Sequence, residues 1–320
     1  MALDNAGRRA DMLRGPFSGR RFQESPIVSR PFRLLVVEGN PPAMRARHAA
    51  VSGRTPSAFY ADVLEEVAGW QGLNVAVDVA YPADPGANLP DAAGIASYDG
   101  VVITGSGLNL WKAEPESLTQ VELAREVYRS GAPFFGSCWG LQVAAVAAGG
   151  EVKLNPQGRE VGVARGLRLT EAGRSHPMHA GRADPFDAPA IHSDEVAVLP
   201  SGAVVTAGND LCAVQAAEIR HEGGVFWGVQ YHPEYTFAEL CGILTRYTPV
   251  MIEEGFVRDA DDAARHIADL ASLDAEPLRR DVAWRLGVSP SVTDPKARRT
   301  ELVNWLTRQV APTASARGRM

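Results

Sequence analysis

Residues 133–150 read PFFGSCWGLQVAAVAAGG and contain the turn that decides how this chain folds. The short apolar stretch at 133–135 predicts a buried β-strand, and the alanine-rich run after the turn predicts a helix. A sharp turn joins the two, with Cys138 at its tip. Gly136 and Gly140 flank the cysteine, because so tight a turn brings their Cα atoms too close together for side chains. The stretch therefore predicts a strand, turn and helix of a parallel α/β sheet.

The same alternation of strand and helix continues on the N-terminal side of this turn. Thr55 and Pro56 supply the N-cap and first position of a helix that stops at Gly69, and a second helix at 118–129 closes at Gly131. Short apolar or alternating runs predict strands at residues 34–37, 75–79 and 101–103. This pattern predicts a doubly wound, mostly parallel sheet with helices on both faces.

Beyond about residue 159 the pattern changes to shorter β-like pieces bounded by Gly, Pro and Asp. They lie at residues 164–169, 196–199, 204–207, 212–219 and 225–229. We expect them to extend the sheet or to form a short antiparallel layer beside it.

We divide the chain into three parts. Residues 1–31 hold six arginines, few apolar side chains and no strand or helix period, which predicts a flexible leader. Residues 32–255 carry the α/β pattern, and residues 256–320 form a C-terminal helical extension whose final helix starts at Asp294 and Pro295. We expect the large apolar side chains of the extension to pack on the outer face of the α/β domain, a subunit interface being the alternative. They are Trp284, Leu286, Leu302, Trp305, Leu306 and Val310.

The composition excludes several classes of protein. The chain has 320 residues, with 32 Lys and Arg against 38 Asp and Glu, and its net charge of -6 disfavours a nucleic-acid partner. No stretch approaches the roughly 18 to 20 consecutive apolar residues that cross a membrane. Three cysteines do not make a disulfide framework and fit a reducing compartment. Without a recognisable targeting segment, we expect a cytoplasmic location.

The position of Cys138 is typical of a nucleophile. The free N–H groups and the dipole at a helix N-terminus favour the thiolate, which is the reactive form. The alternative is a buried structural cysteine, which the flanking glycines disfavour. Cys212 and Cys241 lie in apolar or helical surroundings without such glycines, and we interpret them as core thiols.

A base for this thiol is predicted at the end of a later strand. Tyr231-His232-Pro233-Glu234 follows the strand-like residues 226–230. Pro233 biases His232 to an extended backbone, so His232 and Glu234 project to the same side. The carboxylate then holds the second imidazole nitrogen and fixes its tautomer, as the third member of a triad does.

Two segments resemble motifs of a known family. GSCWGLQ at 136–142 and WGVQYHPE at 227–234 resemble the G-x-C-x-G-x-Q and H-P-E motifs of class I glutamine amidotransferases, in that family's order and spacing. The resemblance, strongest to the free-standing GMP-synthase-like kind, covers roughly residues 33–247. It implies a flavodoxin-like fold and hydrolysis of the glutamine side-chain amide through a γ-glutamyl thioester on Cys138. His232 is then the base and acid, and Glu234 orients it.

The resemblance also implies the surroundings of the reacting amide. An oxyanion hole is expected from the backbone N–H groups of Ser106, in a TGSG loop at 104–107, and of Trp139. Substrate-binding roles are implied for Gly105, Gly107, Gln142 and His192. The last of these begins a His-Ser-Asp segment similar to the family's H-x-D, which we interpret as a structural or substrate-lining element rather than a catalytic one.

No cofactor is predicted. The glycines of residues 105–107 are too few for a dinucleotide fingerprint. His176 and His179 lack the cysteines or carboxylates of a metal site, and we interpret their segment as a surface loop.

The sequence leaves the substrate and the fate of the ammonia open. Glutamine, a γ-glutamyl peptide and a γ-glutamylated amine all present the same scissile carbonyl. No phosphate loop of a synthetase occurs in the chain, so the ammonia is either released or passed to a separate synthetase subunit. A homo-oligomer and a non-catalytic binding protein on the same scaffold remain alternatives, although the intact triad favours an enzyme.

Overall fold

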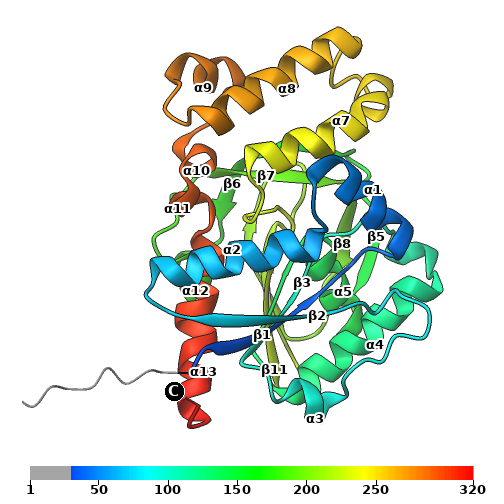
Figure 1. Cartoon of the computed structure of the whole chain (residues 1–320), viewed down its shortest axis with the longest axis vertical. Coiled ribbons are helices and arrows are strands. Elements are labelled where there is room, and N and C mark those ends of the chain that lie inside the picture. Colours follow the sequence, from blue (N-terminus) through cyan, green and yellow to red (C-terminus); the bar gives the residue numbers. More distant parts are fainter. Residues whose placement is uncertain (1–29, 320) are drawn as a thin grey trace, which may run out of the picture.

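The computed structural model describes residues 30–319, so the leader expected at 1–31 lies almost wholly outside the described residues. A nine-stranded sheet runs through the described part in the order β2-β1-β3-β4-β11-β10-β9-β6-β7 (Figure 1). The first five strands in this order run parallel. They are β2 (Val75–Ala80), β1 (Phe32–Val37), β3 (Gly100–Ile103), β4 (Phe134–Ser137) and β11 (Gly224–Val229).

The remaining four strands are antiparallel and continue the same sheet. They are β10 (Ala216–His221), β9 (Ala203–Gly208), β6 (Glu160–Leu169) and β7 (Phe186–His192). A separate antiparallel ribbon pairs β5 (Glu151–Leu154) with β8 (Asp194–Val198). The short β-like pieces of the sequence therefore both extend the sheet and form a small layer beside it.

Helices cover both faces of the sheet (Figure 1). The longer ones in the first two thirds of the chain are α1 (Pro42–Ser52), α2 (Pro56–Trp70), α4 (Pro115–Ser130) and α5 (Trp139–Ala147). Short helical segments are α3 (Ala92–Ile95), η1 (Leu110–Lys112), α6 (Glu171–Ser175) and η2 (Pro177–His179). The predicted caps of α2 and α4 are present: Thr55 accepts a hydrogen bond from Ala58 N at 3.3 Å, and α4 ends at Gly131 with φ 63°.

Alternate residues of β1 enter two different cores. Leu34 and Val36 pack with α2 on one face, whereas Leu35 and Val37 pack with α4 and α5 on the other. The continuous apolar run of residues 34–37 is thus explained by burial on both faces. The predicted α/β fold class, with helices on both faces of a central sheet, is confirmed.

The C-terminal part divides between two cores. α7 (Phe237–Glu253) packs against α8 (Ala260–Ala275), and α9 (Arg280–Leu286) contributes to the same cluster. The chain then returns to the main domain through α10 (Pro290–Thr293), α11 (Pro295–Arg298), α12 (Thr300–Trp305), the π-helical η3 (Leu306–Val310) and α13 (Ala311–Ala316).

The expected packing of the C-terminal apolar side chains is only partly correct. Leu302, Trp305, Leu306 and Val310 are buried in the same core as β1 and α2. Trp284, in contrast, is 86% exposed, because it lies on the outer side of the short α9. Within residues 30–319, no helix is both long and apolar enough to cross a lipid bilayer.

Candidate active site

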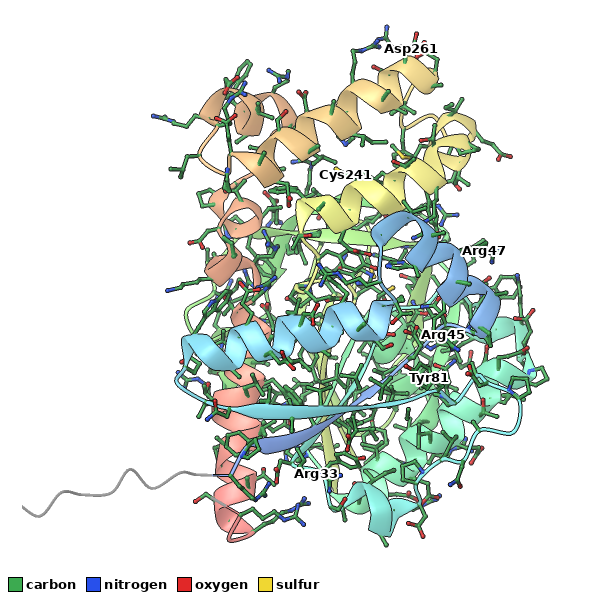
Figure 2. All side chains as sticks on the ribbon, in the orientation of Figure 1. Arg33, Arg45, Arg47, Tyr81, Cys241 and Asp261 are labelled. Atoms are coloured by element: carbon green, nitrogen blue, oxygen red, sulfur yellow. The ribbon has the colours of Figure 1, made fainter. Side chains whose placement is uncertain are left out.

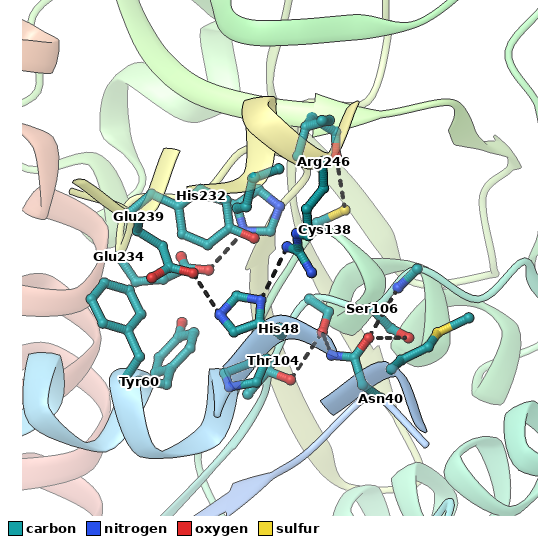
Figure 3. Close-up of a pocket in the computed structure, with 18 of the residues that line it drawn as sticks. Asn40, His48, Tyr60, Thr104, Ser106, Cys138, His232, Glu234, Glu239 and Arg246 are labelled. Atoms are coloured by element: carbon teal, nitrogen blue, oxygen red, sulfur yellow. Dashed lines mark hydrogen bonds and ion pairs between the residues drawn. The ribbon is translucent and has the colours of Figure 1, made fainter. Parts of the chain in front are cut away.

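A cavity of about 500 Å³ lies at the carboxyl ends of the parallel strands. Its lining includes Asn40 after β1, Gly105 after β3, Cys138 after β4 and His232 after β11 (Figure 3). The carboxyl edge of such a sheet is where open α/β folds bind ligands. The topology thus brings the predicted nucleophile, base and glycine loop together.

The turn at Cys138 has the strained geometry of a nucleophile elbow. Cys138 has φ 51° and ψ -101°, a conformation that side-chain-bearing residues rarely adopt. A Cβ atom on Gly136 would lie 2.7 Å from the backbone carbonyl carbon of Gly140, and one on Gly140 would lie 2.6 Å from Ile103 O. Glycine is therefore required on both sides of the cysteine. The turn holds Cys138 at the N-terminus of α5 and in the cavity lining.

A chain of buried hydrogen bonds orients His232. The Nδ1 atom of His232 lies 2.7 Å from Glu234 Oε1, and Ser137 Oγ donates to Glu234 Oε2 at 2.9 Å. Tyr60 OH lies 3.0 Å from Ser137 Oγ. The ring of Tyr235 stacks on the imidazole, with the ring centroids 3.9 Å apart and the planes 3° from parallel. These contacts fix the imidazole and leave its Nε2 edge for Cys138.

The electrostatics favour a protonated His232. Burial alone lowers the pKa of this imidazole, but the Glu234 carboxylate and the Cys138 sulfur outweigh that effect and raise the pKa from 6.5 to about 10. An imidazolium beside a thiol stabilises the thiolate. The raised pKa of His232 therefore favours a protonated imidazole beside Cys138.

We expect Glu234→Gln to lower the pKa of His232 by about 1–3 units, because the variant removes an opposite charge in direct contact with the ring. A nitrogen NMR titration of the imidazole measures this shift. A raised folded-state pKa means that the ion pair stabilises the fold fully below pH 6.5 and loses this effect as the pH rises towards 10. The difference in free energy of unfolding between wild type and Glu234→Gln should shrink over that range. An unchanged titration midpoint in the variant would show that Glu234 does not hold the imidazolium.

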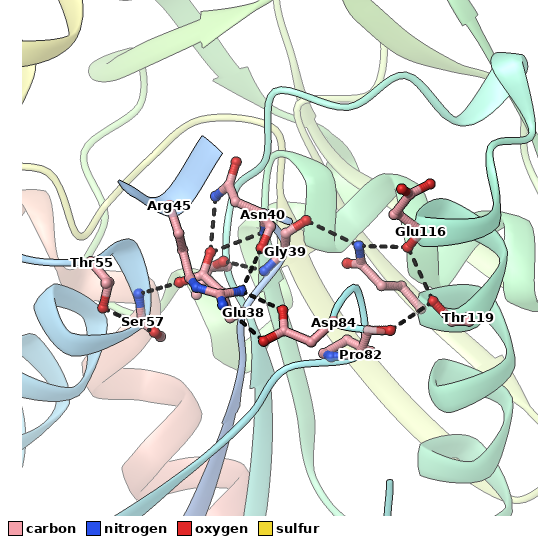
Figure 4. Close-up of polar contacts among 12 residues, drawn as sticks. Glu38, Gly39, Asn40, Arg45, Thr55, Ser57, Pro82, Asp84, Glu116 and Thr119 are labelled. Atoms are coloured by element: carbon pink, nitrogen blue, oxygen red, sulfur yellow. Dashed lines mark hydrogen bonds and ion pairs between the residues drawn. The ribbon is translucent and has the colours of Figure 1, made fainter. Parts of the chain in front are cut away.

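The loop after β3 is held in place by Asn40. Its amide nitrogen donates to Gly105 O at 3.1 Å, and its amide oxygen accepts from Gly107 N at 3.3 Å. Glu38 anchors Asn40 in turn, since Glu38 Oε1 accepts from the backbone and side-chain nitrogens of Asn40, at 3.0 and 2.9 Å (Figure 4). The other Glu38 oxygen accepts from Ser57 N at the start of α2, at 2.9 Å. β1, α2 and the glycine loop thereby form one rigid unit.

Gly105, Ser106 and Gly107 all line the cavity. A Cβ atom on Gly105 would lie 2.6 Å from His232 Cε1, so only glycine permits the loop to approach the imidazole. Ser106 N and Trp139 N have no hydrogen-bond acceptor within residues 30–319. Two backbone donors thus remain available, one in the cavity lining at Ser106 and one directly after Cys138 at Trp139.

Two of the residues with an implied substrate role do not line the cavity. Gln142 is buried, and its amide nitrogen donates to Asp194 O and Gln230 Oε1, both at 3.3 Å. His192 is also buried, with Nε2 2.8 Å from Glu160 Oε2 and Nδ1 3.0 Å from Asp194 O. These contacts turn both side chains away from the cavity. The preceding residue, Ile191, does line it, and its carbonyl oxygen lies 3.8 Å from Cys138 Sγ.

The expectation of a surface loop at His176 and His179 is wrong. His179 is buried between Thr206 Oγ1 at 2.9 Å and Glu301 Oε1 at 3.3 Å. His176 Nε2 lies 3.0 Å from Glu218 Oε2. Both histidines therefore make structural contacts. Within the described residues, no group of three or more metal-ligating side chains surrounds them or any other point.

The other two thiols are unsuited to nucleophilic chemistry. Burial raises the pKa of Cys212 to about 12 and that of Cys241 to about 11. Cys241 lies on α7, outside the cavity (Figure 2). Thiols with such pKa values stay protonated near neutral pH.

The outer part of the cavity is built by residues that sequence reasoning missed. From α1 and α7 come Met44, Arg47, His48, Glu239, Ile243, Arg246 and Tyr247. α1 carries no clear apolar stripe, so no periodicity in the sequence marked it. The only available signal was the unexplained cluster of charge at Arg45, Arg47 and His48.

The chain is similar in sequence to one known protein family and to individual proteins. The sequence profile of the family described as glutamine amidotransferase class-I matches residues 71–241. The chain is 38% identical, over 290 residues, to a γ-glutamyl-L-1-hydroxyisopropylamide hydrolase from a Pseudomonas species, and the match covers 88% of this chain and 94% of that protein. It is 30% identical over 182 residues to a glutamine-hydrolyzing GMP synthase from Edwardsiella ictaluri, covering 50% of this chain and 32% of that enzyme.

Two solved structures share the fold. A glutamine amidotransferase from Thermotoga maritima superposes with a TM-score of 0.59 at 16% identity, over 88% of this chain and 99% of that one. A glutamine amidotransferase from Methylobacillus flagellatus gives a TM-score of 0.56 at 19% identity, over 86% and 94% of the two chains. At such identities these likenesses concern the fold alone.

Proposed function

This chain belongs to the class I glutamine amidotransferase family, and we propose that Cys138, His232 and Glu234 are the triad with which it hydrolyses the C–N bond of γ-glutamyl amides. The observation that carries the proposal is the strained turn that holds Cys138 in one cavity with a buried His232 that is hydrogen-bonded to Glu234. A thiolate beside an imidazolium supplies both the nucleophile and the proton that a departing amine needs.

In the first step, the Cys138 thiolate attacks the γ-carbonyl carbon, and the carbonyl oxygen takes up the negative charge. We assign the stabilisation of this oxyanion to the N–H groups of Ser106 and Trp139, each of which contributes about 3 kcal/mol to transition-state binding in such sites. As the C–N bond breaks, His232 gives its proton to the amine nitrogen and a γ-glutamyl thioester remains. Water then attacks the thioester carbon while His232 accepts its proton. Glutamate leaves, and the thiolate–imidazolium pair is restored.

A substituted amide is the better candidate for the physiological substrate. The Pseudomonas relative is by its name a hydrolase of a hydroxyisopropylamide, and this chain spans 94% of it. The chain spans only 32% of the GMP synthase from Edwardsiella ictaluri. We therefore propose release of an organic amine into solution.

Transfer of ammonia to a separate synthetase subunit is the second candidate, supported by the similarity to GMP synthases. It differs from the first candidate in its preferred substrate. An ammonia donor should favour glutamine over substituted amides, and a hydrolase of substituted amides should do the reverse.

A glutamine-like diazoketone should stop hydrolysis by alkylating one thiol. We expect mass spectrometry to find the added mass on the Cys138 peptide alone, since Cys212 and Cys241 have pKa values of about 12 and about 11. Glutamine should protect Cys138 from the reagent. Labelling of either other thiol with loss of activity would mean that the nucleophile is assigned incorrectly.

A further inference from the structure

The cavity is much larger than the leaving group of glutamine. Ammonia occupies about the volume of one water molecule, roughly 30 Å³, whereas the cavity measures about 500 Å³. A volume of this order is typical of sites that enclose a small organic ligand. The cavity is therefore of a size that can hold a γ-glutamyl group with a leaving group larger than ammonia.

The geometry of the reaction indicates which part of the cavity receives the leaving amine. His232 must face the amine nitrogen in order to protonate it, whereas the carbonyl oxygen points to the N–H groups beside Cys138. The amine side of the substrate consequently lies on the His232 side of the scissile bond. Residues of α1 and α7 line the same cavity as His232 and the stacked Tyr235. We call this outer part, lined by Met44, Arg47, His48, Glu239, Ile243, Arg246 and Tyr247, the α1–α7 compartment.

Both walls of the α1–α7 compartment are fixed. On the outer side of α1, Arg45 pairs with Asp84 at 2.7 Å and lies over the ring of Tyr81, 4.6 Å from its centroid (Figure 2). On the inner side, His48 Nε2 lies 2.6 Å from Glu239 Oε1 of α7. Ser52 at the end of α1 donates to the same carboxylate oxygen at 3.3 Å. These contacts join α1 to Asp84 and to α7, and the compartment between the two helices is open in this structure.

A polar relay runs along the inner wall. Arg246 Nη2 donates to His48 Nδ1 at 3.2 Å, so the imidazole proton sits on Nε2 and faces Glu239 (Figure 3). Glu239 Oε1 thus lies close to both His48 and Ser52, although His48 Nε2 makes no hydrogen bond of regular geometry within residues 30–319. Arg246 keeps unused capacity, because its Nε–H is buried and has no partner within residues 30–319. Arg246 also lines the cavity, so other donors of its guanidinium group can reach a ligand there.

The charges of the α1–α7 compartment indicate what kind of acceptor fits. Arg47 is exposed at its outer edge and pairs with no carboxylate in the described part of the chain (Figure 2). Arg246 likewise has no carboxylate partner there. The guanidinium groups of Arg47 and Arg246 outnumber the single carboxylate of Glu239 in this compartment. Such surroundings repel a second ammonium group and attract an oxygen that carries lone pairs or negative charge.

We propose that the α1–α7 compartment is the binding site for the leaving amine, and that the amine carries an oxygen acceptor, a hydroxyl or a carboxylate, which Arg246 binds. The inference rests on the proposed γ-glutamyl amide hydrolysis and names the substrate class of that same site. Arg246 is a specificity-determining residue in this arrangement. It acts before the thioester is formed, because the amine has departed by the time water attacks.

The test is a matched series of γ-glutamyl amides on a three-carbon amine. The amine is 2-aminopropane, 2-aminopropan-1-ol, alanine or 1,2-diaminopropane, and glutamine supplies the unsubstituted amide. We expect kcat/KM for one of the two oxygen-bearing amides to exceed that for the 2-aminopropane amide by about 10-fold or more, and the diamine amide to be the poorest. A higher kcat/KM for the amide of 2-aminopropan-1-ol would indicate that Arg246 binds a hydroxyl, and a higher kcat/KM for the amide of alanine would indicate a carboxylate.

Arg246→Gln should reduce that preference to about threefold or less, and Arg246→Lys should retain part of it, since lysine keeps the charge but not the fork of donors. The control is Arg265→Gln on the exposed face of α8, outside the cavity, which should leave the preference unchanged. Once the γ-glutamyl thioester on Cys138 has formed, its rate of hydrolysis should be the same in the Arg246 variants and in wild type, whichever amide supplied the γ-glutamyl group. Single-turnover kinetics measure this rate.

Two failures are distinguishable. If wild type cleaves no γ-glutamyl amide, the proposed function fails. If it cleaves all five equally, prefers the diamine amide, or keeps its preference in Arg246→Gln, the assignment of the α1–α7 compartment is overturned while the proposed function stands.

Discussion

Replacing Cys138 by alanine is expected to lower kcat/KM for γ-glutamyl amide hydrolysis by about 10⁴-fold or more, because the reaction loses its nucleophile. The fold should persist. The cysteine side chain is small, and the turn is fixed by the hydrogen bond from Cys138 N to Val229 O at 2.7 Å and by the close packing of Gly136 on Gly140. Glutamate release gives the rate, and thermal unfolding checks the fold.

The matched control is Cys138→Gly. Glycine adopts the φ of 51° without strain, so this variant should be as inactive as Cys138→Ala and no less stable, despite the greater freedom of its unfolded chain. Turnover of either variant within tenfold of wild type would exclude the thioester mechanism. A large loss of stability in both would instead mean that the thiol contributes to packing more than to chemistry.

The sequence predicts well those elements whose burial can be inferred from the residues of the element itself. β1 is apolar at nearly every position because it is covered on both faces. The two motifs are also local: one turn brings Cys138 to the tip of β4, and one dipeptide step separates His232 from Glu234. Contiguous residues therefore predicted Cys138, His232 and Glu234 as site residues, and the structure places all three in the lining of one cavity.

The elements that the sequence did not predict depend on distant partners. β7 contains Pro189, which lowers its strand propensity, but β7 is the edge strand of the sheet, so the missing N–H has no ladder to complete. α1 is held by Asp84 and Glu239 from distant segments rather than by an apolar stripe. His179 is buried because Glu301 lies against it, 122 residues further along the chain. The sequence likewise did not predict the roles of Glu38, Asn40 and Arg246, because their partners lie far from them along the chain or only become neighbours in the folded structure.

A chain that ends at Arg299 is expected not to fold at 25 °C. Truncation there removes Leu302, Trp305, Leu306 and Val310, all fully buried in the core shared with β1 and α2. Burying each such side chain contributes roughly 1.5–3 kcal/mol, and together they account for a loss comparable with the whole stability of a domain, about 5–15 kcal/mol. Circular dichroism and size-exclusion chromatography of the truncated chain test this expectation.

Two tryptophans of the C-terminal extension show whether the loss is one of packing. Trp305 rests on β3, where a Cβ atom on Gly100 would lie 2.8 Å from its ring, and Trp305→Ala should cost about 3–5 kcal/mol. Trp284 is 86% exposed, and Trp284→Ala should change the free energy of unfolding by less than about 0.5 kcal/mol. A soluble, active truncated chain of smaller oligomeric size would identify α12 and α13 as an interface and refute the packing argument.

The truncation also removes a buried charge. Burial alone raises the pKa of Glu301, but Arg182 and His179 outweigh it and lower the pKa to about 2. Glu301→Gln leaves Arg182 buried without a counter-charge, which costs about 3–5 kcal/mol at neutral pH. Because the folded pKa is depressed, this stabilisation is present above about pH 4.5 and is lost as the pH falls towards 2.

Urea denaturation of Glu301→Gln and wild type should therefore give converging free energies of unfolding in acid, whereas the cost of Trp305→Ala should not depend on pH. A deficit of Glu301→Gln that persists unchanged in acid would mean that side-chain shape, not charge, joins α12 to the main domain.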